Sequence, residues 1–239
     1  MVRHRLCACA LAALLLLAST LQAETLTLTA VDLGYYEQMS SDSGYSDPLT
    51  VNYLAGRYTF GTTGEYRNFF VFNLGTVTDQ IVSAKLVLNT LGIQAANEYE
   101  TFQLYDATTP IATLTAGGYN QSDTFSDLGS GVAYGSRNYY PSESDSDGTN
   151  NTRAEIILNA DFVAAANTAR GGEVALGGAV TSLLPASTAD QYLFGYADAT
   201  PLTDAQLVIE TVPVPEPSML FLSAAGCVGL LAFAWRKRR

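Results

Sequence analysis

The chain has 239 residues and a formal net charge of −11, which allows one domain or two small ones. The 189 residues from 24 to 212 hold six Lys and Arg against 22 Asp and Glu, a net charge of −16. A surface of this sign repels nucleic acid, so no nucleic-acid partner is expected. The same stretch has no cysteine and no histidine, which excludes disulfides, Cys–His or Ser–His–Asp catalysis and the usual zinc sites.

The first 23 residues have the layout of a secretory signal peptide. Arg3 and Arg5 precede an apolar stretch, residues 6–18, and a small residue, Ala23, ends the segment at a cleavage site. Polar residues follow the short apolar stretch early, which disfavours a transmembrane helix here. We therefore expect an exported protein whose mature chain begins at Glu24.

Residues 24–212 are predicted to be strands almost throughout. Residues 66–74 are apolar on both faces, which indicates a central buried strand with Phe70 and Phe72 on one face. Residues 81–88 alternate between apolar and polar, which indicates a half-exposed strand that buries Leu86 and Leu88. Further strands are predicted at 24–31, 100–105, 111–115, 154–159, 173–176, 191–196 and 205–212.

Only residues 161–169 have a helical pattern, since they are rich in alanine and end before two glycines. Many short strands with one short helix predict an all-β domain: an antiparallel β-sandwich, jelly-roll-like. We expect this single extracytoplasmic domain to span residues 24–212.

The last 27 residues, 213–239, differ from the rest of the chain. Residues 218–235 form an uncharged apolar run that spans about 27 Å as a helix, close to the thickness of a bilayer core. Four cations follow, and by the positive-inside rule they remain in the cytoplasm. The run therefore predicts a transmembrane helix. The four cations that follow it are Arg236, Lys237, Arg238 and Arg239.

Four residues precede this helix: Val214, Pro215, Glu216 and Pro217. Together with the helix and the terminal cations they resemble the PEP-CTERM signal of exosortase-sorted bacterial surface proteins, a segment also known as the ice-binding protein C-terminal domain. The resemblance implies export, transient anchoring in the inner membrane, cleavage by an exosortase near Pro-Glu-Pro, and a final place at the cell surface or in exopolysaccharide. An ordinary C-terminal anchor is the alternative, although it would not need the Pro-Glu-Pro sequence.

Carboxylates are the remaining candidates for chemistry. Glu65, beside the predicted buried strand, and Asp127, before a glycine turn, are the carboxylates most worth examining, but no motif identifies a nucleophile or a base. We therefore expect that the protein is not an enzyme. Glu143, Asp145 and Asp147 alternate before Gly148 like the first half of a calcium loop, although Ala154 stands where the closing Glu belongs. The alternatives here are a calcium site and a solvated polar loop.

Two function classes stay open: a structural or adhesive component of the surface or matrix, and a carbohydrate-binding module of the cell surface. Tyrosine doublets near turns, Tyr35–Tyr36 and Tyr139–Tyr140, suit stacking on sugar rings or filling of strands. Thr25, Thr27 and Thr29 form one threonine row of the kind used in ice binding, but no repeat extends it.

Overall fold

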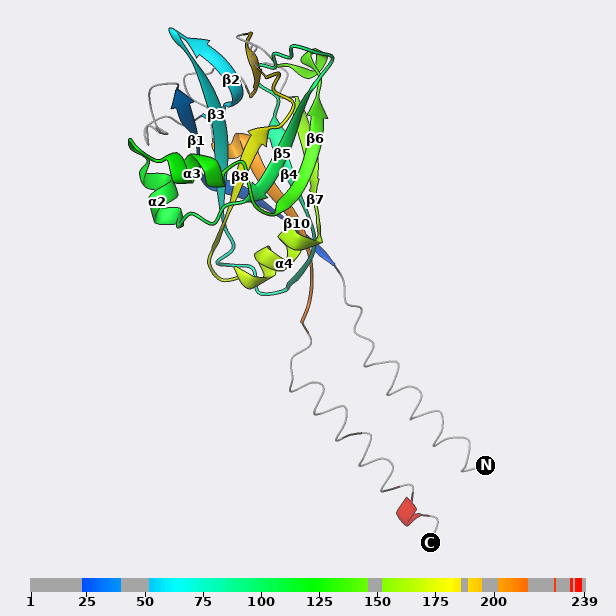
Figure 1. The fold of residues 1–239 in the computed structure, drawn as a ribbon. Coiled ribbons are helices and arrows are strands. Elements are labelled where there is room, and N and C mark those ends of the chain that lie inside the picture. The colour runs from blue at the N-terminus through cyan, green and yellow to red at the C-terminus, as the bar shows by residue number, and fades with distance from the viewer. Residues whose placement is uncertain are drawn as a thin grey trace.

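The computed structural model describes residues 23–39, 52–145, 152–185, 189–194, 202–214, 226, 233 and 235–237 (Figure 1). The predicted signal peptide, except Ala23, and most of the predicted helix 218–235 lie outside this set. Among the described residues, none of the helices combines the length and the apolar character needed to cross a membrane.

Ten described strands pair into one sheet, and every pair of strands is antiparallel. The order along the sheet is β6-β5-β8-β3-β1-β10-β4-β7, while β2 pairs with β3 and with β9. The strands are β1 (Glu24–Met39), β2 (Ala55–Phe60), β3 (Thr62–Asn73), β4 (Gln80–Asn89), β5 (Glu100–Asp106), β6 (Ala133–Tyr139), β7 (Arg153–Leu158), β8 (Glu173–Val180), β9 (Gln191–Leu193) and β10 (Ala205–Val212).

Strand β1 joins the two halves of the sheet. Residues 24–29 pair with β10, and the rest of β1 pairs with β3. The register shifts between Ala30 and Asp32, which is typical of a β-bulge, and bulges bend a strand and increase its twist. One long strand can therefore serve both halves of a strongly curved sheet.

The two outer strands of this order, β6 and β7, meet at one end. Asn159, directly after β7, donates from its backbone nitrogen to the Tyr134 carbonyl at 2.8 Å and from Nδ2 to the Ala133 carbonyl at 2.7 Å. A Cβ on Gly135 would lie 2.5 Å from the carbonyl oxygen of Ile157, so the close approach requires glycine. The sheet is therefore a nearly closed barrel. The all-β, antiparallel prediction is confirmed, and the narrower jelly-roll-like sandwich stays a prediction.

Within 24–212 the described residues contain three α-helices, where the sequence predicted one: α2 (Ile111–Ala116), α3 (Ser122–Asp127) and α4 (Ala160–Thr168). The predicted strand at 111–115 is wrong, because α2 occupies it and buries Leu114 against the outer face of the sheet. The predicted helix at 161–169 is confirmed as α4, and its N-cap is Asn159, whose side chain accepts from the backbone of Asp161 and Phe162. Two short 3₁₀ helices, η1 (Pro141–Glu143) and η2 (Leu202–Asp204), complete the elements.

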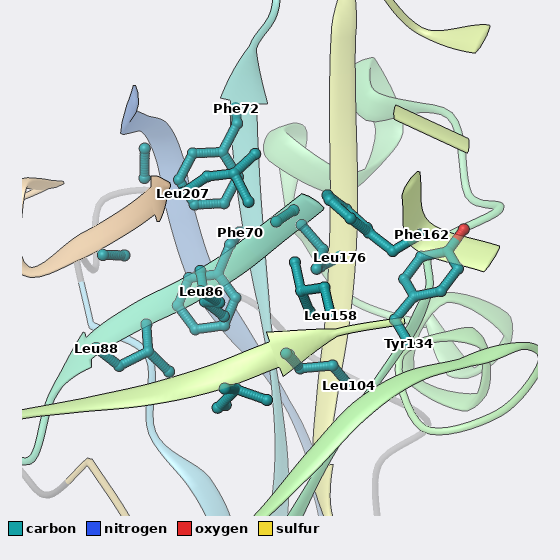
Figure 2. Packing of buried hydrophobic residues seen from close by; sticks show 14 of the residues in the cluster. Phe70, Phe72, Leu86, Leu88, Leu104, Tyr134, Leu158, Phe162, Leu176 and Leu207 are labelled. Carbon is teal, nitrogen blue, oxygen red and sulfur yellow. The ribbon is translucent and has the colours of Figure 1, made fainter. Parts of the chain in front are cut away.

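The barrel interior holds the main core, as predicted. Phe70, Phe72, Leu86 and Leu88 are each 0% exposed and belong to one cluster, in which side chains from both halves of the sheet interdigitate (Figure 2). A second, smaller cluster lies on the outer face of the sheet under α2 and α3; its members are Tyr36, Phe69, Val71, Leu114, Phe125, Leu128 and Ala175.

Candidate functional site

The barrel has two distinct ends. Glu24, the first residue of β1, pairs with Thr211 near the end of β10, so both chain termini leave the domain at the same place (Figure 1). We call this the terminal end; it also contains the start of β4 and helix α4. The far end contains β2, β9, η1 and residues 91–99, which join β9 through the bridge between Gln94 and Tyr192.

Side chains of α4 and of the residues after it stabilise the terminal end through hydrogen bonds. Asn167 accepts from the backbone nitrogen of Ile81 at 3.0 Å and donates to the Ile81 carbonyl at 2.8 Å. Arg170 donates to the Thr78 carbonyl at 2.8 Å. These contacts fix the first residues of β4, which lie beside the last residues of β10.

Buried carboxylates and tyrosines occupy the far end. Glu37 is 8% exposed and accepts a hydrogen bond of 2.5 Å from the hydroxyl of Tyr66, its neighbour across β1 and β3. Burial, and then the hydrogen bond to Glu37, raise the pKa of the Tyr66 hydroxyl above its ordinary value. Tyr35 packs edge-on against Tyr66, with ring centroids 5.3 Å apart.

Glu100, at the start of β5, fixes the segment that precedes it. It is 0% exposed, and its carboxylate accepts from the Ala96 backbone at 3.1 Å, from Gln191 Nε2 at 3.0 Å and from the Ser182 hydroxyl. A buried carboxylate with three donors is stable only where all of them stay in place. Residues 96–99 are therefore held against β5 and β9.

An exposed tyrosine pair results from this arrangement. Tyr99, just before β5, and Tyr140, just after β6, are 37% and 38% exposed, with ring centroids 5.6 Å apart and planes inclined by 60°. The sequence predicted no difference in exposure between the two tyrosines of each doublet. In the structure Tyr36 and Tyr139 are 0% exposed, whereas Tyr35 is half-buried.

One of the predicted calcium residues, Glu143, lies beside this pair. Glu143 Oε1 contacts Arg137 Nη2 at 2.5 Å, and its Oε2 accepts from the Tyr140 backbone at 3.0 Å. Burial opposes ionisation, but the hydrogen bonds from Arg137 and the Tyr140 backbone, together with the charge of Arg137, outweigh it and lower the pKa of Glu143. Asp145 is 3% exposed and accepts from the Thr152 backbone at 3.3 Å.

Asp147 lies outside the described residues, and the described part of the chain shows no group of three His, Cys, Asp or Glu placed to hold a metal. The calcium site therefore stays a prediction. The Arg137–Glu143 ion pair, which the sequence did not predict, gives Glu143 a partner of its own.

The two other candidate carboxylates, Glu65 and Asp127, are engaged in local contacts. Glu65 pairs with Arg67 at 3.1 Å, and Asp127 accepts four hydrogen bonds from the backbones and hydroxyls of Thr108 and Thr109. The threonine row of β1 is exposed, but it is one strand of a mixed face: Thr25 pairs with Glu210 and Thr27 with Val208.

The sorting residues follow the terminal end directly. Val214 is 51% exposed, and Lys237 and Arg236 are described, whereas Pro215, Glu216, Pro217, Arg238 and Arg239 lie outside the described residues. The molecule is thus a nearly closed antiparallel β domain followed by a distinct C-terminal segment.

That segment, residues 213–239, matches the family model of the PEP-CTERM protein-sorting motif. The predicted PEP-CTERM signal is confirmed: the chain carries the C-terminal signal of exported proteins that an exosortase recognises and sorts.

No curated protein sequence matches the chain. Among solved structures, the K1 cleaved adhesin domain of Lys-gingipain from Porphyromonas gingivalis is similar over 80% of this chain and 98% of that domain, with 11% identity and a TM-score of 0.27. A TM-score this low supports no argument about fold or function.

Proposed function

We propose that the protein is a structural or adhesive component of the cell surface or of the exopolysaccharide matrix, and that it is not an enzyme. The observation that carries the proposal is the sorting motif directly after the last strand of an acidic β domain. In this proposal residues 1–23 are a signal peptide, residues 218–235 anchor the precursor in the inner membrane, and an exosortase then removes the tail.

Mass spectrometry of the mature protein from its host tests the sorting step. The surface or matrix form is expected to begin at Glu24 and to end after Val212 or within Pro-Glu-Pro. A strain without its exosortase is the control and should accumulate the tail-bearing form. Trp235 and the terminal cations in the mature surface protein would contradict the proposal.

A second candidate is carbohydrate binding at the far end, and the exposed Tyr99–Tyr140 pair favours it. Tyrosine rings offer an apolar face for a sugar ring and a hydroxyl for hydrogen bonding. The adjacent charged side chains, Arg137 and Glu143, form an ion pair with each other. Since residues 24–212 carry −16, a neutral sugar is the best-suited ligand.

A glycan array probed with residues 24–212 tests this second candidate. Tyr99→Ala and Tyr140→Ala are each expected to weaken binding by roughly tenfold, because aromatic anchors commonly contribute more than about 1 kcal/mol. The control is Tyr119→Ala, which removes a tyrosine that is 66% exposed and lies outside the pair. Unchanged binding in both pair variants, or no glycan bound by the parent, would reject the site.

A further inference from the structure

Strand β10 lies inside the sheet almost to its last residue. Thr211 pairs with Glu24 of β1 on one side and with Ile81 of β4 on the other, and Val212 pairs with Gln80. Thr211 and Ile81 are each 1% exposed. The folded domain therefore continues to the residue before the matched sorting motif.

The neighbouring strand β4 is held in place beside the end of β10. Asn167 holds both backbone groups of Ile81, and its Nδ2 also donates to the Val163 carbonyl of α4 at 2.9 Å. The end of β10 consequently lies beside a strand that a helix side chain holds in place.

Little chain separates this ladder from the motif's Pro-Glu-Pro. Only Pro213 and Val214 lie between Val212 and Pro215, and two extended residues reach at most about 7 Å. Proteins that bind an extended peptide commonly add it as a strand, which needs several residues with an unpaired edge. Of the residues directly before Pro213, Thr211 pairs with both β1 and β4, and Val212 pairs with β4.

We propose that Thr211 and Val212 control removal of the sorting tail, and that the tail is cut only after these two residues have left the sheet. The inference rests on the proposed cleavage by an exosortase. Strand ends open locally at far lower free energy than the whole domain, so the remaining barrel stays folded during the cut. Pairing with β1 and β4 then limits how fast the anchored precursor is released.

Pulse-labelling of the full chain in its host measures the half-life of the tail-bearing form. Six Gly and Ser residues inserted between Val212 and Pro213 supply a free extended segment without altering the barrel. We expect a several-fold shorter half-life. The same insertion after Gly61, in the exposed turn between β2 and β3 where a Cβ would meet nothing within 4 Å, is the control and should match the parent.

A second variant separates strand opening from the distance to the membrane. Asn167→Ala loosens the start of β4 and leaves the spacing to the tail unchanged, so it should also shorten the half-life. Its matched control is Thr168→Ala, which removes only a bond to the Ala164 carbonyl within α4. If the insertion accelerates cleavage and Asn167→Ala does not, the spacing between the domain and the tail alone sets the cleavage rate, and the inference fails.

The remaining outcomes are equally decisive. Cleavage of the parent with equal half-lives in all variants overturns this inference and leaves sorting intact. Retention of the tail in the parent and in every variant contradicts the proposed cleavage itself, and the inference falls with it.

Discussion

The interior of the barrel is apolar at the terminal end and rich in polar groups at the far end. Near the termini, Phe72, Leu74, Ile81, Phe162 and Ile209 are 0–1% exposed and pack together. The far end also buries apolar rings such as Phe194, but it adds buried carboxylates, amides and tyrosines: Glu37, Tyr53, Tyr66, Asn68, Glu100, Tyr139 and Gln191.

This difference indicates that the two ends of the domain have different roles. Burial of apolar side chains is the main stabilising contribution to folding, and the terminal end supplies it next to the attachment point of the tail. Buried polar groups stabilise little net, but they fix the positions of the groups around them. The far end is thus organised to present side chains, and the following predictions test this contrast.

The largest effect is expected from Phe72→Ala in the apolar half. Removal of a fully buried ring should lower the free energy of unfolding by about 3–5 kcal/mol. Denaturant unfolding measures the loss. Ile157→Ala, at a side chain that is 70% exposed, is the control and should change stability by less than about 0.5 kcal/mol. A loss below about 1 kcal/mol at Phe72 would mean that this half is not the stabilising one.

Calcium should act at the far end if the acidic loop binds it. An ion that binds only the folded form, at 100 times its dissociation constant, stabilises that form by about 2.7 kcal/mol. We expect millimolar calcium to raise the melting temperature of residues 24–212 above that in sodium chloride of matched ionic strength. Asp145→Asn with Asp147→Asn should remove the difference. Identical melting curves in the two salts would identify the loop as a solvated turn.

Tyr66→Phe should have a smaller effect, of about 1.5 kcal/mol at neutral pH, because it deletes a hydrogen bond to a carboxylate. Since the pKa of Tyr66 is raised in the folded state, the unfolded chain loses this proton first as pH passes about 10. The stabilisation is complete below that pH and is lost as the pH rises further.

Unfolding measured at pH 7 and above pH 10 checks the sign. Tyr66→Phe should weaken the alkaline loss of stability, whereas the exposed control Tyr119→Phe should leave it unchanged. Burial also raises the pKa of Tyr53, Tyr139 and Tyr192 at the far end and of Tyr134 beside α4, so most of the alkali-sensitive tyrosines lie at the far end. An equal pH dependence in Tyr66→Phe and the parent would contradict this.

The sequence was sufficient for the regular parts of the fold. Strand β3 was predicted because its residues are apolar on both faces, β4 because its apolar and polar residues alternate, and α4 because its alanines precede two glycines. Segment 111–115 was misassigned because five residues do not distinguish a strand from a helix; the packing of Leu114 on the outer sheet face decides for the helix.

The far end was less accessible to sequence reasoning. Strand β6 was missed because Gly135, Arg137 and Asn138 interrupt its apolar pattern, and with it the Arg137–Glu143 pair was missed. The Tyr99–Tyr140 pair depends on where β5 and β6 end, and the Glu100 contacts join residues 82 and 91 positions apart. Contacts across such separations leave no periodic signal in one sequence.

The seam between β6 and β7 affects how the mature protein behaves among its own copies. Unpaired strand edges are templates for pairing with other chains and for aggregation. Asn159 occupies the carbonyls of Ala133 and Tyr134 at this seam, and Gly135 lets β7 approach them. Self-association through strand addition is thereby disfavoured at the seam, so contacts between neighbouring copies there would have to use side chains, which can form and break reversibly.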